Sequence, residues 1–292
     1  MFIKRLTDTQ FGLLLLFPLI LLLFFLNGYP IIYSFWLSLT NYDISKGTSD
    51  FIGFLNYYNL FLKDPYFLNS LGVTLRFAIE ATILSTILGL GIALLLNENF
   101  KGRSFMRALV LLPWAFSTYA VATLFRYFLA QNVGFLSSFI YSLGLTKEMI
   151  NFLTIEHAID FVSIAFAWNI APLGAFFLLA NLQVIPEDLF RQAKIDRANI
   201  FQRFRYVIFP FLKYPLIVVL ILNNLFSVTE TTLILILTGG GPGVSTQVLS
   251  YWAFAQSFMN YSFGYGAAIS WVLVLIALMI GLIYFSIVTK LK

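Results

Sequence analysis

The sequence predicts an all-α membrane protein, a single bundle of about six transmembrane helices that occupies residues 1–292 as one domain. Only 11% of the residues are charged, against roughly a quarter in a soluble domain, and 60% are hydrophobic. The mean hydropathy is +0.88. Apolar runs long enough to span a bilayer recur along the chain. The runs are continuously apolar rather than alternating, which favours helices over barrel strands.

The spans are expected in six places. The first is Phe11–Leu26, with an extension through Ile31–Leu39 beyond Pro30, a residue expected to kink or break the helix. The others are Leu71–Leu96, Phe105–Ala130 with Pro113 inside, Ile159–Leu182 with Pro172 inside, Tyr214–Leu237, and the uncharged Gly266–Thr289.

The first apolar run could instead be a cleaved signal peptide, because Lys4 and Arg5 precede it. The residues that follow, Asn27 to Tyr33, contain no small-residue cleavage pattern. We therefore expect a retained membrane anchor.

Lysine and arginine predict the orientation, because they concentrate on the cytoplasmic side. Thirteen of the 18 fall on one side of the predicted topology: Lys4, Arg5, Lys101, Arg103, Arg107, Arg191, Lys194, Arg197, Arg203, Arg205, Lys213, Lys290 and Lys292. Both termini and residues 183–213 are therefore expected in the cytoplasm of a multi-pass protein of the cell membrane. Basic residues used in this way indicate no nucleic-acid partner.

Several chemical functions are disfavoured by composition. The chain has no cysteine and a single histidine, His157, which excludes thiolate chemistry and makes a metal site a poor expectation. No phosphate-binding loop with its lysine is present, and Gly239–Gly243 is expected to form a turn. No catalytic residue, cofactor or metal is expected in this chain, which is not expected to be an enzyme.

Residues 183–213 are expected to fold rather than form a simple link. Pro186 followed by Glu187 and Asp188 favours a helix start, and Asn199 can cap a second short helix. Both helices are amphipathic. Periodicity alone leaves open that the second lies on lipid headgroups.

The order of residues in this segment resembles the E-A-A-x-x-x-G loop of binding-protein-dependent ABC importer permeases. The matching positions are Pro186, Ala193, Asp196, Ala198, Phe204 and Pro210. The family usually has Glu at Arg191, Ala at Gln192 and Gly at Arg197, where glycine would permit a left-handed turn. Two outer segments, Gly53–Tyr57 and Thr238–Pro242 with its continuation to Ala268, are similar to those of MalF/UgpA-like carbohydrate permeases.

This resemblance implies a MetI-like permease that translocates a sugar by alternating access. Its implied partners are a second permease, two ATPase subunits that bind ATP and magnesium, and an extracellular solute-binding protein. The coupling contacts would be Arg191, Ala193, Asp196, Arg197, Ala198 and Phe204. A permease for a non-sugar solute remains an alternative, as does a secondary transporter, although neither inverted repeats nor ionisable relays are evident.

Polar residues within the spans are candidates for the substrate pathway. A carboxylate at membrane depth costs about 2.5–3.5 kcal/mol, so Glu230 is expected to face the bundle interior or a water-filled cavity. Asn223 and Asn224 lie two turns earlier, and Trp168 with Asn169 suits a sugar's C–H face and hydroxyls. Each could equally be a hydrogen-bonding residue between helices.

Overall fold

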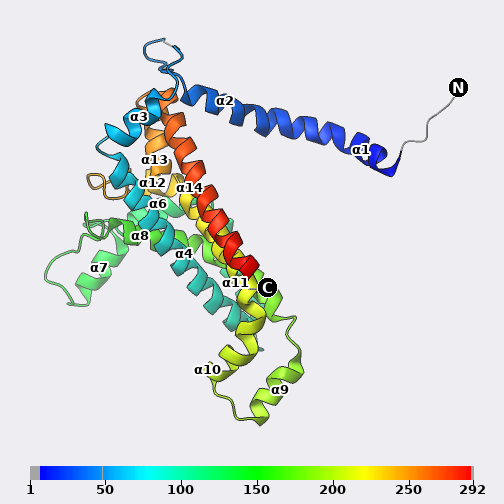
Figure 1. The fold of residues 1–292 in the computed structure, drawn as a ribbon. Coiled ribbons are helices and arrows are strands. Elements are labelled where there is room, and N and C mark those ends of the chain that lie inside the picture. The colour runs from blue at the N-terminus through cyan, green and yellow to red at the C-terminus, as the bar shows by residue number, and fades with distance from the viewer. Residues whose placement is uncertain (1–6, 48, 291–292) are drawn as a thin grey trace.

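The computed structural model describes residues 7–47 and 49–290, and its described part is helical with no extended strand. Figure 1 shows a bundle of long helices from which the N-terminal helix projects. The elements are α1 (Asp8–Leu23), η1 (Phe24–Gly28), α2 (Tyr29–Ser38), α3 (Leu55–Leu62), α4 (Phe67–Asn97), α5 (Arg103–Ala115), α6 (Thr118–Phe128), α7 (Phe135–Ser142) and α8 (Ala158–Leu182). They continue as α9 (Glu187–Ile195), α10 (Ile200–Arg203), η2 (Phe204–Ile208), α11 (Phe209–Thr229), α12 (Thr232–Leu237), α13 (Leu249–Phe254), η3 (Ala255–Met259) and α14 (Phe263–Lys290). Lys4, Arg5 and Lys292, used above for orientation, lie outside the described residues.

Three of the predicted spans are confirmed as single helices: α4, α8 and α14. Long apolar runs in lipid form helices because a helix pairs every internal backbone N–H and C=O group within the same segment. Pro172 lies inside α8 without ending it.

The first span is a continuous helix from Thr9 to Ser38, so the extension beyond Pro30 is confirmed and the proline does not break the helix. The turn before the proline, η1, widens so that the N–H of Tyr29 bonds to the carbonyl of Phe24. Pro30 then occupies the first turn of α2, where its missing N–H disturbs the helix least.

The third predicted span, Phe105–Ala130, is wrong as a single helix. It consists of α5 and α6, which meet at an angle of 91°. Phe116 is extended, and the Ser117 side chain accepts a 3.3 Å hydrogen bond from the N–H of Ala120, which starts α6 afresh. Pro113 lies one turn before this corner and weakens the helix there, because it cannot donate a backbone hydrogen bond.

The fifth span, expected at Tyr214–Leu237, begins and ends earlier than predicted. One helix runs from Ile200 to Thr229. Glu230 is extended, and α12 follows as a separate short helix. The expected second loop helix is therefore the start of this span, because η2 carries the helix past Pro210 instead of ending it.

The core is built around α8, two thirds of whose apolar window (67%) is buried. Its main neighbour is α4, and the two approach closely where Gly89 faces the backbone of Ala171 and Ala175. A Cβ at Gly89 would lie 3.0 Å from the carbonyl of Ala171, so glycine permits this packing distance.

Candidate functional site: the projecting loop and the polar residues of the spans

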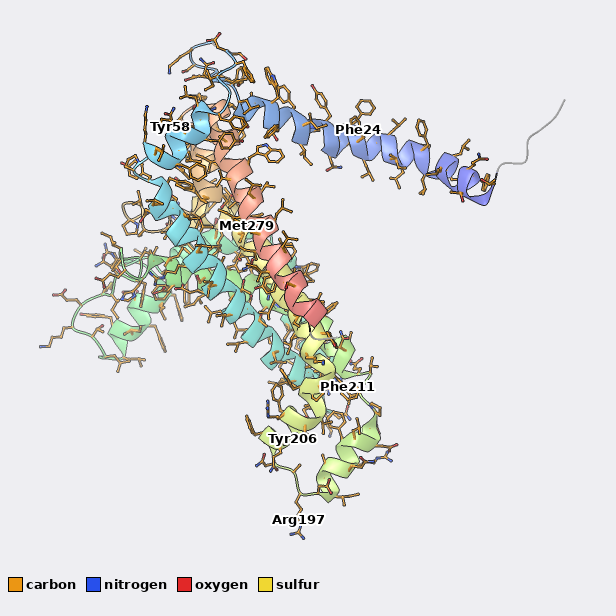
Figure 2. All side chains as sticks on the ribbon, in the orientation of Figure 1. Phe24, Tyr58, Arg197, Tyr206, Phe211 and Met279 are labelled. Carbon is orange, nitrogen blue, oxygen red and sulfur yellow. The ribbon has the colours of Figure 1, made fainter. Side chains whose placement is uncertain are left out.

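The segment predicted to fold, residues 183–213, projects from one end of the bundle as α9, a turn and α10, with Arg197 at its tip (Figures 1 and 2). The predicted start is confirmed: α9 begins directly after Pro186, with Glu187 and Asp188 in its first turn. These carboxylates lie at the positive end of the helix dipole and also reach Arg191, at 3.4 and 3.5 Å.

The turn after α9 is left-handed, the conformation that a glycine at position 197 would permit. Arg197 adopts a left-handed conformation with φ 53°. Its N–H bonds to the carbonyl of Lys194 at 3.1 Å, and the N–H of Ala198 bonds to that of Ala193 at 2.9 Å. This is the Schellman pattern that ends many helices. The chain thus keeps the turn and places the strain on Arg197.

The predicted cap at Asn199 is confirmed. Its side chain accepts from the N–H of Gln202 at 2.8 Å, and the Gln202 side chain accepts from the N–H of Asn199 at 2.9 Å. This reciprocal capping box fixes the start of the helix that continues into α11. The projecting segment is therefore joined to a membrane span without a flexible link.

The six predicted coupling residues do not share one face. Asp196, Arg191 and Arg197 are exposed, whereas Ala193 is 8% exposed and faces the chain itself. Phe204 packs against the apolar cluster at the inner ends of α4, α8 and α11, and Ala198 is half-buried. The apolar side chain most exposed in α9 is Ile195, at 79%.

The predicted pathway residues on α11 bond to another helix. The Asn223 amide donates to Thr86 Oγ1 at 3.1 Å, and the Asn224 amide donates to Thr82 Oγ1 at 3.4 Å. Both asparagines are buried. They connect α11 to α4 through polar contacts inside the bundle.

Asn169 completes the corner between α5 and α6. Its amide donates a 2.6 Å hydrogen bond to the carbonyl of Pro113, which would pair with Ser117 if the helix continued. The neighbouring Trp168 is partly buried and packs edge-on against Phe125, with ring centroids 5.7 Å apart.

Glu230 lies at the break between α11 and α12, not within a helix as predicted. Its Oε1 accepts a 2.8 Å hydrogen bond from the N–H of Leu233, so the carboxylate caps α12. Its backbone carbonyl accepts from Ser250 Oγ at 2.5 Å. Glu230 therefore contacts both α12, through its side chain, and α13, through its backbone carbonyl.

An ionic cluster between α4 and α8 was only partly visible in the sequence. Arg76 pairs with Glu80 at 2.7 Å, as the four-residue spacing indicates, and also with Asp160 from α8. Ser163 donates to Glu80 at 3.3 Å. Asp160 and Arg76 are 84 positions apart, and no local pattern joins them.

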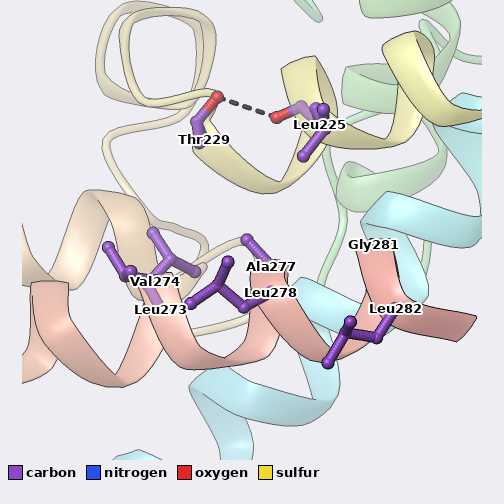
Figure 3. Close-up of a pocket in the computed structure, with 8 residues that line it drawn as sticks. All are labelled: Leu225, Thr229, Leu273, Val274, Ala277, Leu278, Gly281 and Leu282. Carbon is purple, nitrogen blue, oxygen red and sulfur yellow. Dashed lines mark hydrogen bonds between the residues drawn. The ribbon is translucent and has the colours of Figure 1, made fainter. Parts of the chain in front are cut away.

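Among the described residues, no group of three or more His, Asp and Glu side chains could hold a metal. Gly239–Gly243 forms a turn, as predicted, in which a Cβ at Gly240 would lie 2.5 Å from the Tyr251 ring. A groove between α11 and α14 is apolar, and Thr229 in it bonds to its own helix at Leu225 (Figure 3).

A bundle of long apolar helices, with a folded helical loop projecting from one end, defines a polytopic membrane protein. The chain belongs to the family described as the binding-protein-dependent transport system inner membrane component, which matches residues 85–292. It is accordingly an inner-membrane component with several membrane-spanning helices.

The similarity to known proteins extends over nearly the whole length of this chain. The trehalose/maltose transport system permease protein MalF of Thermococcus litoralis is 35% identical over 96% of this chain and 94% of its own. The trehalose transport system permease protein SugA of Mycobacterium tuberculosis is 30% identical over 91% and 85%. A chain of a bacterial alginate ABC transporter, crystallised with an alginate pentasaccharide-bound periplasmic protein, has a TM-score of 0.78 at 20% identity over 92% and 91%. That last likeness concerns the fold alone.

Proposed function

We propose that this chain is the membrane-spanning permease subunit of an ATP-driven ABC importer that translocates a mono- or oligosaccharide delivered by an extracellular solute-binding protein. The observation that carries the proposal is the projecting α9–α10 element, joined rigidly to a span. The names of MalF and SugA support a sugar as the solute.

Two ATPase subunits supply the energy and bind ATP and magnesium. This chain contains no phosphate-binding loop, so hydrolysis belongs to a partner. The exposed tip of α9, with Ile195 beside the turn, is the contact through which such a partner acts. The distribution of lysine and arginine supports a cytoplasmic location for both chain termini and for this tip.

A second permease completes the membrane-embedded unit. The apolar window of Thr9–Ser38 has no buried residue within the described chain, whereas the other unbroken spans bury 22–67% of theirs. Figure 2 shows Phe24 of this helix well away from the bundle. A second helical subunit beside it extends the bundle, while lipid covers the remaining face.

The geometry supports a lever-like coupling. The helix from Ile200 to Thr229 is about 45 Å long at 1.5 Å per residue. A push on α9 moves its start, and the break at Glu230 lets α12 change its angle to α11. The hydrogen bonds of Asn223 and Asn224 couple that motion to α4.

Reconstituted transport tests the function. The chain is purified with its co-purifying subunits, placed in liposomes with the cognate binding protein, and assayed for uptake of labelled trehalose or maltose. Uptake should require ATP. Ion-gradient-driven uptake by this chain alone would instead establish the secondary-transporter alternative. A screen of non-sugar solutes with the binding protein checks the substrate class.

A matched pair of substitutions tests the docking contact. Ile195→Asp places a charge on a side chain that is 79% exposed, so it should leave the fold intact and reduce ATPase retention at least tenfold. Val184→Asp is the control, since Val184 is 75% exposed at the base of the same segment. Equal ATPase retention by both variants would refute docking through the α9 tip.

A further inference from the structure

A large cavity opens at the end of the bundle that carries α9 and α10. Its volume is about 1430 Å³, and it lies between the ends of α4, α5 and α8 and the α9–α10 segment. One wall is apolar and includes Leu94, Leu182, Ile185 and Ile208. The cavity therefore has an apolar surface next to a polar rim, where α4, α5 and α8 begin or end.

The rim carries more positive than negative charge. Four basic side chains line the cavity: Arg103, Arg107, Lys194 and Arg203. The two acidic side chains that line it already have partners. Glu98 lies 3.6 Å from Arg203, and Glu187 lies 3.4 Å from Arg191 outside the cavity.

Arg107 has unused hydrogen-bonding capacity at this site. Its Nε and Nη2 atoms are buried and have no hydrogen-bond partner among the described residues. Burying nitrogen donors of a charged group without partners is costly, more so than burying a neutral donor. Arg103 differs, because it donates to the Leu96 carbonyl at 2.7 Å and to Asn99 at 3.1 Å.

The start of α5 adds to the positive potential. Its N-cap, Gly102, offers no capping side chain, and the first turn contains no acid. Lys101, Arg103 and Arg107 lie in or beside the first turns, where the helix dipole disfavours cations. α9 shows the opposite arrangement, with two acids in its first turn. An anion placed beside the first turns of α5 would therefore stabilise them.

We propose that this cavity binds the phosphate group of an anionic phospholipid of the inner leaflet. Arg107 and Lys194 hold the phosphate, and the acyl chains lie along the apolar wall at Leu94 and Ile208. Bidentate donation from Arg107 supplies the partners that its guanidinium lacks. The inference rests on the cytoplasmic orientation of the proposed function but not on its sugar substrate. Basic pockets between spans on the cytoplasmic side commonly take such headgroups.

Lipid titration followed by native mass spectrometry tests the proposal on the chain purified with its co-purifying subunits. Phosphatidylglycerol should bind at least tenfold more tightly than zwitterionic phosphatidylcholine. Arg107→Gln and Lys194→Gln should each weaken phosphatidylglycerol binding about fivefold, the loss expected for one basic contact. The control is Lys147→Gln, which removes an equal charge from the loop that follows α7. Lys147 does not line the cavity, so this variant should bind phosphatidylglycerol as the wild type does.

The arms of the experiment separate the sources of phosphate and guard against misfolding. Arg107→Lys keeps the charge and should retain more binding than Arg107→Gln. Lys194 is exposed, so Lys194→Gln should leave the fold intact. Glycerol 3-phosphate without acyl chains should compete only at far higher concentration. Equal binding of soluble phosphate overturns the lipid assignment, and equal phosphatidylglycerol affinity across all variants overturns the site. Either result leaves the transport assay unaffected.

Discussion

The backbone at Arg197 is strained, and replacing this residue with glycine should stabilise the projecting loop. Its φ of 53° lies in the left-handed region. For a residue with a Cβ, this conformation costs about 1–2 kcal/mol of folding free energy. Glycine removes that cost but makes the unfolded chain more flexible, which offsets about 0.4–1 kcal/mol. The net gain for Arg197→Gly is about 1 kcal/mol.

The assay is amide hydrogen exchange at Ala198, whose N–H bonds to the Ala193 carbonyl at 2.9 Å and closes the turn. Exchange requires this turn to open, so its rate follows the local opening equilibrium. A gain of about 1 kcal/mol corresponds to exchange slower by about fivefold. The Asn199 capping box next to the turn should be protected in parallel.

The matched control is Arg197→Ala, which removes the charge and the long side chain but keeps the Cβ. Its exchange rate should stay within about twofold of the wild type, because the steric cost persists. If Arg197→Ala slowed exchange as much as Arg197→Gly does, charge rather than backbone strain would explain the effect. If glycine gave no protection, the left-handed conformation would not be the strained feature of this loop.

Three further outcomes follow from the structure. Asn169→Leu removes the donor to the Pro113 carbonyl and should lower the free energy of unfolding by about 1–3 kcal/mol, seen as a lower Tm of the purified complex. The control is Asn181→Leu, which loses only a hydrogen bond within its own helix and should have a Tm near that of the wild type. Glu230→Ala should reduce solute uptake while the complex still assembles, because the cap of α12 is worth about 1 kcal/mol, and unchanged uptake would remove this residue from the mechanism. In intact cells Gly243→Cys should react with an impermeant thiol reagent and Lys194→Cys should not; the cysteine-free background makes the labelling specific, and the reverse pattern would invert the topology.

The position of Glu230 shows how contacts distant in sequence change the role assigned to a residue. A carboxylate inside an apolar run predicts an inward-facing group, but periodicity places it in the middle of one helix. The structure ends that helix at Thr229 and uses the carboxylate as a cap. Ser250, 20 residues further on, fixes the carbonyl at the break, and no local signal announces it.

The sequence by itself determined the membrane-spanning helices α4, α8 and α14, because an apolar run of sufficient length has no other stable backbone in lipid. It also determined the start of α9 and the cap at Asn199, which depend on residues three positions apart or fewer. Only the tertiary structure decided where spans break. The 91° corner after α5 is maintained by Asn169, 56 positions from the carbonyl that it bonds. Backbone groups freed at such breaks need partners from other helices, and which helices supply them is set by packing rather than by local pattern.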